Sequence, residues 1–430
     1  MVRIVVALAL TWGIAHASPV TPGRAAGLPT AEEADAAVEA AEAAAKAPAD
    51  ADRGELLHKL VDALVTAAQV AGPNAKGSTY RARAVEVAKG LREGSPGYAR
   101  LAEVLLLEGE ALAGLNRRSE ALARWDDVTK SHGSTPAAQD AWSRIGDLWF
   151  DQAGLDKALH AYDMAAKAGP GSRLWPWAVY RRGWCHVNLG DFAAALADFE
   201  ALLDAPGTDP YLLKVRAEAE KDWVFAYAAA SDPADAPKRV AERFPGRERP
   251  MLLRLADSYD QQGRTQHAIR QWRALVERAA IPERVDLLVR VVRGTLAMGD
   301  LRGTVSAIDE LTRLIKGARP SKDVTQADLA GPDAAAETLV RQICVDWVSE
   351  HRKTRDREQA TRAIDVCGLY LELWPHAAMA PEVRLSRGSA LLDAGRKAEA
   401  IVELEAAEST HPVAASRDAA RMLLDRARSR

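Results

Sequence analysis

Two short stretches of the sequence hold residue types that could bind phosphate. Residues 72–79 read GPNAKGST, in which glycines and a lysine resemble a phosphate-binding loop. The lysine, however, precedes the second glycine, and a predicted helix rather than a strand comes before it. We therefore interpret this stretch as a helix end followed by the next N-cap. Residues 351–357, HRKTRDR, gather one histidine and four other basic residues. They could hold a phosphate or a lipid headgroup, but basic residues at a helix C-terminus are more often solvated.

Other chemical motifs are scarce. The chain has no G-x-S-x-G, H-E-x-x-H or C-x-x-C sequence. Cys185 and His186 are adjacent, so on a helix they would point about 100° apart and would not share a metal. The sequence predicts no catalytic residue, no bound cofactor and no metal site. Its net charge of −3 likewise gives no general attraction for nucleic acid.

The three cysteines are Cys185, Cys344 and Cys367, which allow at most one internal disulfide. If 335–352 and 357–373 form an antiparallel helical hairpin, Cys344 and Cys367 lie at depths that differ by roughly 3 Å. A disulfide between them is possible when both side chains face the partner helix.

The first seventeen residues have the pattern of a secretory signal peptide. A positively charged start precedes an apolar core of twelve residues, and Ala15 and Ala17 are the small residues that a signal peptidase recognises. An uncleaved anchor is the alternative, although about 20 residues are needed to span a bilayer. We expect cleavage before Ser18, and a periplasmic or otherwise exported mature chain without a transmembrane segment.

Repeated pairs of helices are the elements that must position the cysteines and the other candidate residues of the chain. Two helical faces recur in residues 141–170, one in each helix of the pair. Small residues let the two helices approach, aromatic residues fill around the contact, and a proline ends the second helix. The residues concerned are Trp142, Ile145, Gly146, Trp149, Ala158, Tyr162, Ala165 and Pro170.

Similar patterns recur about every 37 residues. They occupy 102–135, 176–209, 249–282, 285–318 and 381–414, with a degenerate copy at 210–246. This pattern resembles the tetratricopeptide repeat family. The resemblance implies an all-α, right-handed solenoid of helical hairpins that binds partners on its concave face. The period of about 37 residues is similar to that of bacterial envelope members of this family. More loosely, 181–203 and 347–376 look like myxobacterial gliding-motility and outer-membrane-associated periplasmic repeat proteins.

The pattern predicts a chain organised in six parts. Residues 31–98 lack clean repeat signatures and would cap the first hydrophobic face of the solenoid. Two prolines and mixed polar residues mark an internal break before the last repeats. The expected parts are a signal peptide (1–17), a mobile leader (18–30), a helical cap (31–98), the repeat array (99–318), a linker (319–333) and C-terminal repeat-like units with a closing helix (334–430).

Two adjacent stripes of side chains are predicted to form the partner-binding groove. They are Asp140, Ser143, Asp147 and Phe150 from one repeat, and Trp177, Tyr180 and Trp184 from the next. The resemblance places the aromatic stripe toward the groove, where it would offer contact area at little entropic cost. The aspartates would select a basic or amide-rich segment. The alternative is that the second helix of the neighbouring repeat, or the degenerate repeat that follows, covers the aromatic residues.

The sequence therefore predicts a non-enzymatic protein–protein interaction scaffold of the bacterial cell envelope. Its expected partners are envelope or outer-membrane-associated proteins. The alternative is an adaptor subunit of an envelope enzyme complex that handles peptidoglycan or polysaccharide.

Overall fold

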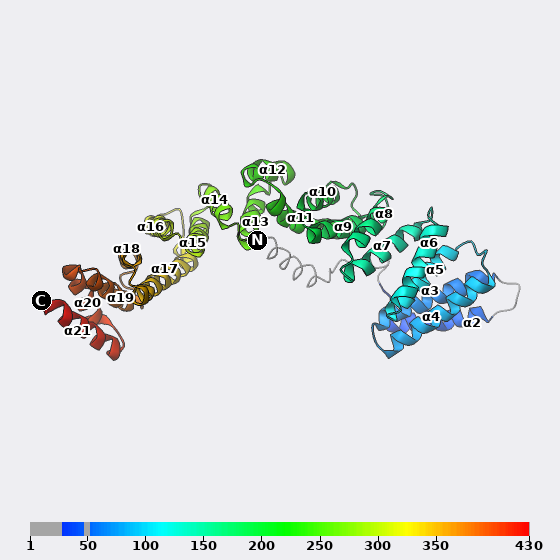
Figure 1. Ribbon diagram of the computed structural model, residues 1–430, viewed down its shortest axis with the longest axis horizontal. Coiled ribbons are helices and arrows are strands. Elements are labelled where there is room, and N and C mark those ends of the chain that lie inside the picture. Colours follow the sequence, from blue (N-terminus) through cyan, green and yellow to red (C-terminus); the bar gives the residue numbers. More distant parts are fainter. Residues whose placement is uncertain (1–27, 47–51, 430) are drawn as a thin grey trace. The chain divides into compact units, whose positions relative to one another are not determined.

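The computed structural model describes residues 28–46 and 52–429 (Figure 1). Over these residues the chain forms twenty α-helices and one short 3-10 helix, and no strand. The predicted all-α solenoid of helical hairpins is confirmed. The signal peptide, and the leader as far as residue 27, lie outside the described residues.

The helices belong to two compact units that divide between Ser231 and Asp232. Unit 1 contains α2 (Ala31–Ala45), α3 (Arg53–Ala71), α4 (Ala75–Gly94), α5 (Leu101–Gly114), α6 (Arg118–Ser131), α7 (Pro136–Asp151), α8 (Leu155–Ala166), α9 (Trp175–Leu189), α10 (Phe192–Asp204) and α11 (Pro210–Ala230). Unit 2 contains η1 (Pro233–Asp235), α12 (Ala236–Arg243), α13 (Glu248–Gln261), α14 (Thr265–Val276), α15 (Ile281–Ala297), α16 (Leu301–Ala318), α17 (Gln326–Thr354), α18 (Arg357–Leu373), α19 (Ala380–Asp393), α20 (Lys397–Thr410) and α21 (Ala414–Arg428). Within each unit, most helices pack against the helices just before and after them in the chain. The hydrophobic core therefore runs along each stack instead of gathering at one centre.

The repeat pattern has a direct physical cause in the hairpins. A Cβ atom added at Gly146 in α7 would lie 2.5 Å from the ring of Tyr162 in α8. A Cβ atom added at Gly183 in α9 would lie 2.7 Å from the ring of Phe199 in α10. Tyr162 and Phe199 are both fully buried. Glycine is therefore needed at this position because an aromatic ring occupies the space of its side chain.

The stretch GPNAKGST forms the corner between α3 and α4. Gly72 follows α3 with φ of +76°, a backbone conformation that favours glycine. Asn74 is the N-cap of α4, and its side-chain oxygen accepts a hydrogen bond from the Gly77 N–H at 2.8 Å. The interpretation as a helix end and an N-cap is confirmed, because these polar groups serve the helix termini.

The linker predicted over 319–333 is wrong for its second half. Residues 326–333 form the first two turns of α17, with Pro332 inside the helix. Thr325 caps this helix, and Leu329 is buried. Asp333 then accepts hydrogen bonds from Arg319 (3.0 Å) and from the Trp374 indole (2.7 Å). These tertiary contacts stabilise a helical turn that the Gly-Pro sequence alone disfavours.

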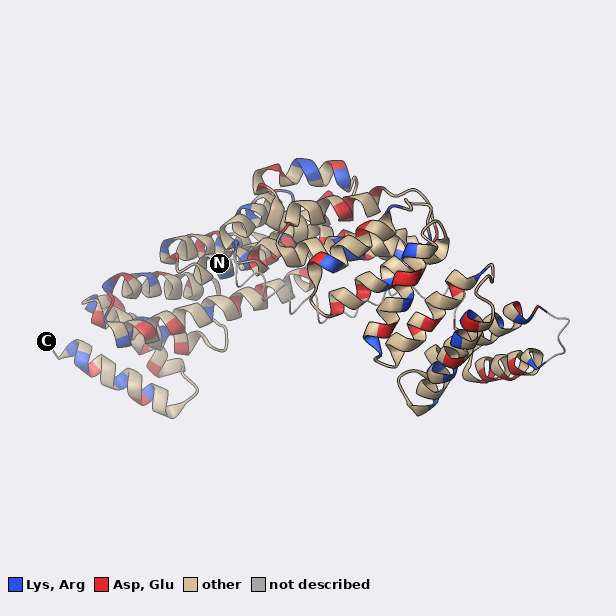
Figure 2. Ribbon diagram, turned by 45° about the vertical axis from the view of Figure 1, so that its right-hand side comes forward, with Lys and Arg blue, Asp and Glu red and all other residues tan. Residues whose placement is uncertain are grey.

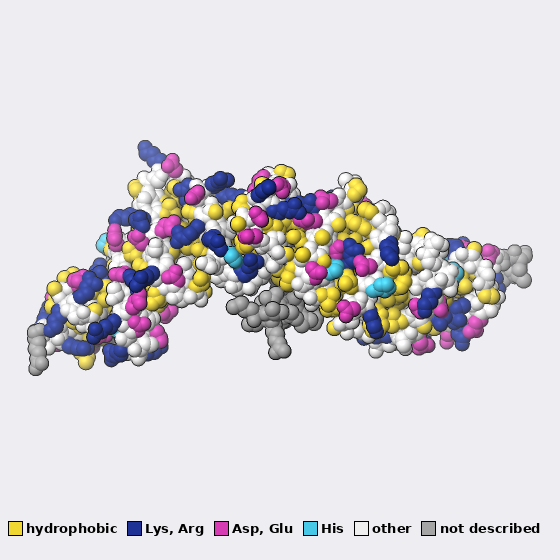
Figure 3. Space-filling view, turned by 45° about the horizontal axis from the view of Figure 1, so that its top comes forward, with side chains coloured by type: hydrophobic (Ala, Val, Ile, Leu, Met, Phe, Trp, Pro, Cys, Tyr) yellow, Lys and Arg dark blue, Asp and Glu magenta, His cyan; other side chains and the backbone are white. Residues whose placement is uncertain are grey.

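Charged side chains of both signs are interspersed over the helices (Figure 2), and on the face shown in Figure 3 neither sign forms a large patch. No helix in the described part of the chain combines the length and apolar character needed to cross a membrane.

Candidate functional site

The two predicted stripes lie side by side in unit 1. The Trp177 indole on α9 donates a hydrogen bond to the Asp147 carboxylate on α7 at 3.1 Å. Two turns nearer the start of α7, Asp140 accepts a hydrogen bond from Arg173 at 2.7 Å. The first contact joins α7 to α9, the first helices of two consecutive hairpins, and the second joins α7 to the loop before α9.

Asp147 is the centre of a polar network between α7, α8 and α9. Its carboxylate accepts a hydrogen bond from the Tyr162 hydroxyl at 2.7 Å and lies 3.5 Å from Arg181 Nε. The Arg181 guanidinium also lies 3.9 Å from the centre of the Phe150 ring. Burial and the neighbouring Asp147 charge raise the pKa of Tyr162 well above its ordinary value. Much of the hydrogen-bonding capacity of this stripe is therefore used inside the protein.

The aromatic stripe is packed, so the expectation of an open groove at Trp177, Tyr180 and Trp184 is wrong for this structure. These side chains are only 3%, 6% and 8% exposed, respectively. The Tyr180 hydroxyl and the Trp184 indole both donate to Asp222 of α11, at 2.8 Å and 3.0 Å. Helix α11 belongs to the degenerate repeat, which supplies the cover that was the alternative interpretation. Ser143 is also buried, at 1% exposed, and its hydroxyl has no hydrogen-bond partner in the described residues.

An open cleft lies beside Asp140, on the side of unit 1 toward its first helices. Its volume is about 790 Å³, and residues of or next to α2, α3, α5 and α7 line it. Helices α3, α5 and α7 pack in sequence, so the cleft follows the first helices of successive hairpins. Its apolar lining includes Ala34, Ala37, Ala63, Ala102, Leu106, Leu107, Pro136 and Ala137, and its charged lining is Glu33, Glu55, Lys59, Asp62, Arg100, Glu103 and Asp140.

A hydrogen-bonded network forms one wall of this cleft. The Tyr98 hydroxyl donates to Glu55 at 2.7 Å, and His58 Nδ1 lies 3.1 Å from the same hydroxyl. Arg100 donates through Nε to Glu103 at 3.0 Å and also reaches Glu55 at 3.4 Å. Together these contacts hold the His58 ring and both carboxylates at the edge of the cleft.

The same contacts set the protonation states of the wall. Burial and the nearby Arg100 charge lower the pKa of His58. The hydrogen bond from Tyr98 lowers the pKa of Glu55, and the one from Arg100 lowers the pKa of Glu103. Burial and Glu55 raise the pKa of Tyr98 to about 12. At neutral pH the wall therefore presents a neutral imidazole beside two charged carboxylates.

The sequence pattern did not identify His58 as a cleft residue or Tyr98 as its hydrogen-bond partner. Both lie in the segment assigned to the cap, where no repeat position gives a side chain a role. His58 stands in the amphipathic stretch ELLHKLVDALV beside other polar residues, so its position in the sequence does not distinguish it.

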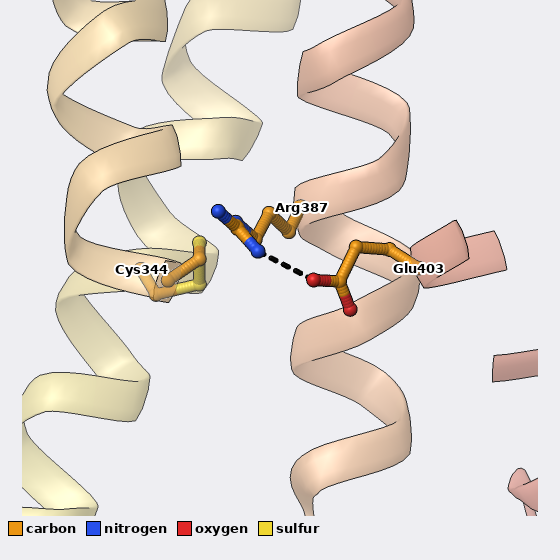
Figure 4. The surroundings of a disulfide bond; sticks show 4 residues. Cys344, Arg387 and Glu403 are labelled. Atoms are coloured by element: carbon orange, nitrogen blue, oxygen red, sulfur yellow. Dashed lines mark hydrogen bonds and ion pairs between the residues drawn. A yellow bond between two sulfur atoms is a disulfide. The ribbon is translucent and has the colours of Figure 1, made fainter. Parts of the chain in front are cut away.

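In unit 2 a disulfide joins Cys344 on α17 to Cys367 on α18 (Figure 4). Both cysteines are fully buried, and their sequence separation is 23. Beside the disulfide, Arg387 of α19 forms an ion pair with Glu403 of α20. Cys185 has no disulfide partner, and burial raises the pKa of its thiol to about 12. The described residues contain no group of three or more histidine, cysteine, aspartate or glutamate side chains arranged to hold a metal ion.

Comparison with known families agrees with the geometry of the hairpins. Sequence models of the tetratricopeptide repeat match residues 106–173 and 177–207. These segments cover α6 to α10 and most of α5. The chain therefore contains tetratricopeptide repeats in unit 1, and such repeats act as protein–protein interaction scaffolds. No curated protein matches the chain.

The chain also matches several solved structures at low identity and with low TM-scores. A tetratricopeptide repeat protein from Parabacteroides merdae is 16% identical, covers 63% of this chain and 98% of that chain, and has a TM-score of 0.32. Naa15/Naa10 bound to HypK-THB is 13% identical, covers 92% of this chain and 65% of that chain, and has a TM-score of 0.36. The APC/C heterotetramer Cut9-Hcn1 is 13% identical, covers 100% of this chain and 99% of that chain, and has a TM-score of 0.30.

Proposed function

We propose that this protein is a non-enzymatic interaction scaffold of the bacterial cell envelope, which holds a protein partner in the cleft of unit 1. The observation that carries the proposal is the open cleft itself, because it follows the first helices of successive hairpins. Its apolar lining and charged edge are the two components of a typical protein interface. The packed aromatic stripe between α9 and α11 offers no such opening.

The envelope location is supported by the sequence of residues 1–17. A charged start, a short apolar core and Ala15-His16-Ala17 together favour export and cleavage. N-terminal sequencing of protein from a periplasmic fraction should give Ser18 as the first residue. Recovery of the uncleaved chain in the cytoplasm would remove this part of the proposal.

Site-specific crosslinking tests the partner site directly. Lys59 lines the cleft, pairs with Glu55 one turn earlier and has a side chain 66% exposed. Lys130 on α6 has the same kind of pairing with Asp126, is 71% exposed and does not line the cleft. A photoreactive residue placed at either position therefore samples a similar local environment.

In the native envelope, the variant at position 59 should capture a defined partner that the variant at position 130 does not. Equal capture by both variants, or capture by neither, would contradict the cleft as the partner site. Co-purification of a peptidoglycan or polysaccharide enzyme as that partner would favour the adaptor alternative.

A further inference from the structure

The wall of the cleft in unit 1 presents an unusual pair of hydrogen-bond acceptors. The Tyr98 hydroxyl has one proton, which it donates to Glu55 at 2.7 Å. Its oxygen therefore accepts from His58 Nδ1–H, which lies 3.1 Å away. In the neutral ring, this leaves the Nε2 atom of His58 as an acceptor with a free lone pair.

The second acceptor is the Glu103 carboxylate. Its Oε2 atom lies 3.9 Å from His58 Nε2, which is too far for a direct hydrogen bond. A single nitrogen donor can lie at about 2.8 Å from both atoms, because charge-assisted bonds have that length. His58 is 5% exposed, so its ring is held in place, while the Glu103 side chain is 45% exposed and accessible.

The charges around the cleft favour a cationic donor. Five carboxylates line it, against the two cations Lys59 and Arg100. Arg100 already donates to both oxygens of this carboxylate, at 3.0 Å and 2.6 Å, so an incoming cation would use the remaining lone pair of Oε2. An anionic ligand would instead meet the excess negative charge.

The apolar lining indicates what must accompany the cation. Ala63, Leu106 and Leu107 lie on the same cleft surface as the acceptor pair. Lysine and arginine side chains can lay their methylene groups along such a surface and direct the charged end to an acceptor. The cleft volume of about 790 Å³ is also large enough for several side chains of a polypeptide.

We infer that the cleft recognises a protein segment through a lysine or arginine side chain, whose cation is held between His58 Nε2 and the Glu103 carboxylate. This inference rests on the proposed function and specifies the chemistry of the partner segment. The carboxylates and the apolar surface of the cleft together select a basic segment with neighbouring apolar residues.

Three synthetic twelve-residue peptides test this specificity, with leucines at fixed positions and either arginine, citrulline or glutamate between them. Citrulline keeps the shape of arginine without its charge. Fluorescence anisotropy with the full chain should show binding of the arginine peptide. The citrulline peptide should bind at least tenfold more weakly, and the glutamate peptide should show no binding.

Matched variants locate the effect. Glu103→Gln should weaken binding of the arginine peptide about tenfold, since it removes one charge-assisted acceptor. Glu120→Gln is the control, because Glu120 forms the same bidentate contact with Arg117 at the start of α6, away from the cleft. His58→Phe keeps a ring but removes the Nε2 acceptor, and should also weaken binding. Circular dichroism confirms that each variant is folded.

Two results would overturn the inference: equal binding of the arginine and citrulline peptides, or equal losses in Glu103→Gln and Glu120→Gln. Sequencing of the partner segment crosslinked at position 59 separates this inference from the proposed function. A captured segment without lysine or arginine would refute the specificity and leave the scaffold function standing. Absence of cleft-specific capture would refute the scaffold site itself.

Discussion

Asp222 should be essential for covering the aromatic stripe of unit 1. Its carboxylate accepts hydrogen bonds from Tyr180 and Trp184, and its side chain lies at an interface where it is only 9% exposed. In Asp222→Leu both donors lose this acceptor, and leaving a buried donor unpaired costs about 1–3 kcal/mol. For the two donors together, we expect the free energy of unfolding to fall by about 2–6 kcal/mol.

Asp222→Asn is the matched control. Its side-chain oxygen can still accept hydrogen bonds, although neutral bonds are roughly half as strong as charge-assisted ones. The asparagine variant should therefore lose about half as much stability as the leucine variant.

Amide hydrogen exchange followed by mass spectrometry measures where the loss occurs. In Asp222→Leu the protection of α9 and α11 should fall, and the protection of α17 and α18 in unit 2 should stay unchanged. The arginine peptide should still bind, because the cleft lies at α2 to α7. Unchanged exchange in α9 and α11 would refute the reasoning, since α11 would then not cover the aromatic stripe in solution.

Three further predictions concern the hairpin contact, the disulfide and the cleft histidine. Gly146→Ala should lower the free energy of unfolding by about 1–3 kcal/mol, because its Cβ would meet the Tyr162 ring. Gly171→Ala, where no atom lies within 4 Å of the added Cβ, should have little effect in the same urea titration. Reduction should lower the melting temperature of the wild type and not that of Cys344→Ala/Cys367→Ala, because the disulfide contributes about 3 kcal/mol for a loop of this length; three reactive thiols in the unreduced, denatured chain would show that no disulfide forms. Because the pKa of His58 is lowered in the folded protein, its contribution to stability is present above its unfolded pKa of about 6.5 and is lost as the pH falls below that value. The charged groups around the ring are Glu55, Asp62, Arg100 and Glu103. The stability of His58→Phe should therefore depend less steeply on pH between 7 and 5 than that of the wild type. Parallel curves of stability against pH would contradict this assignment.

The hairpins could be predicted from the sequence because their pattern reports local contacts. Gly146 and Tyr162 lie on the two helices of the same hairpin, so their complementarity is visible in a single repeat. The corner at Asn74 was predictable for the same reason, since its N-cap bond spans three residues.

The state of the aromatic stripe could not be predicted from the stripe itself. Whether Trp184 is open or covered depends on Asp222, which lies 38 residues away in a repeat without clear signatures. The helical start of α17 depends similarly on Arg319 and Trp374, whose contacts with Asp333 counteract the local effect of Pro332.

The cleft wall illustrates the same limit for function. His58, Tyr98 and Glu103 come from α3, from the loop before α5 and from α5, and no spacing rule connects them. Only the packing of these segments brings an imidazole nitrogen within 3.9 Å of a carboxylate oxygen.

A crystal structure of the full chain with the arginine peptide would test the central claim most directly. We predict peptide density in the cleft of unit 1, with one guanidinium between His58 Nε2 and the Glu103 carboxylate and with α11 still covering Trp184. Peptide bound along α7 and α9 with α11 displaced, or bound outside unit 1, would contradict the account.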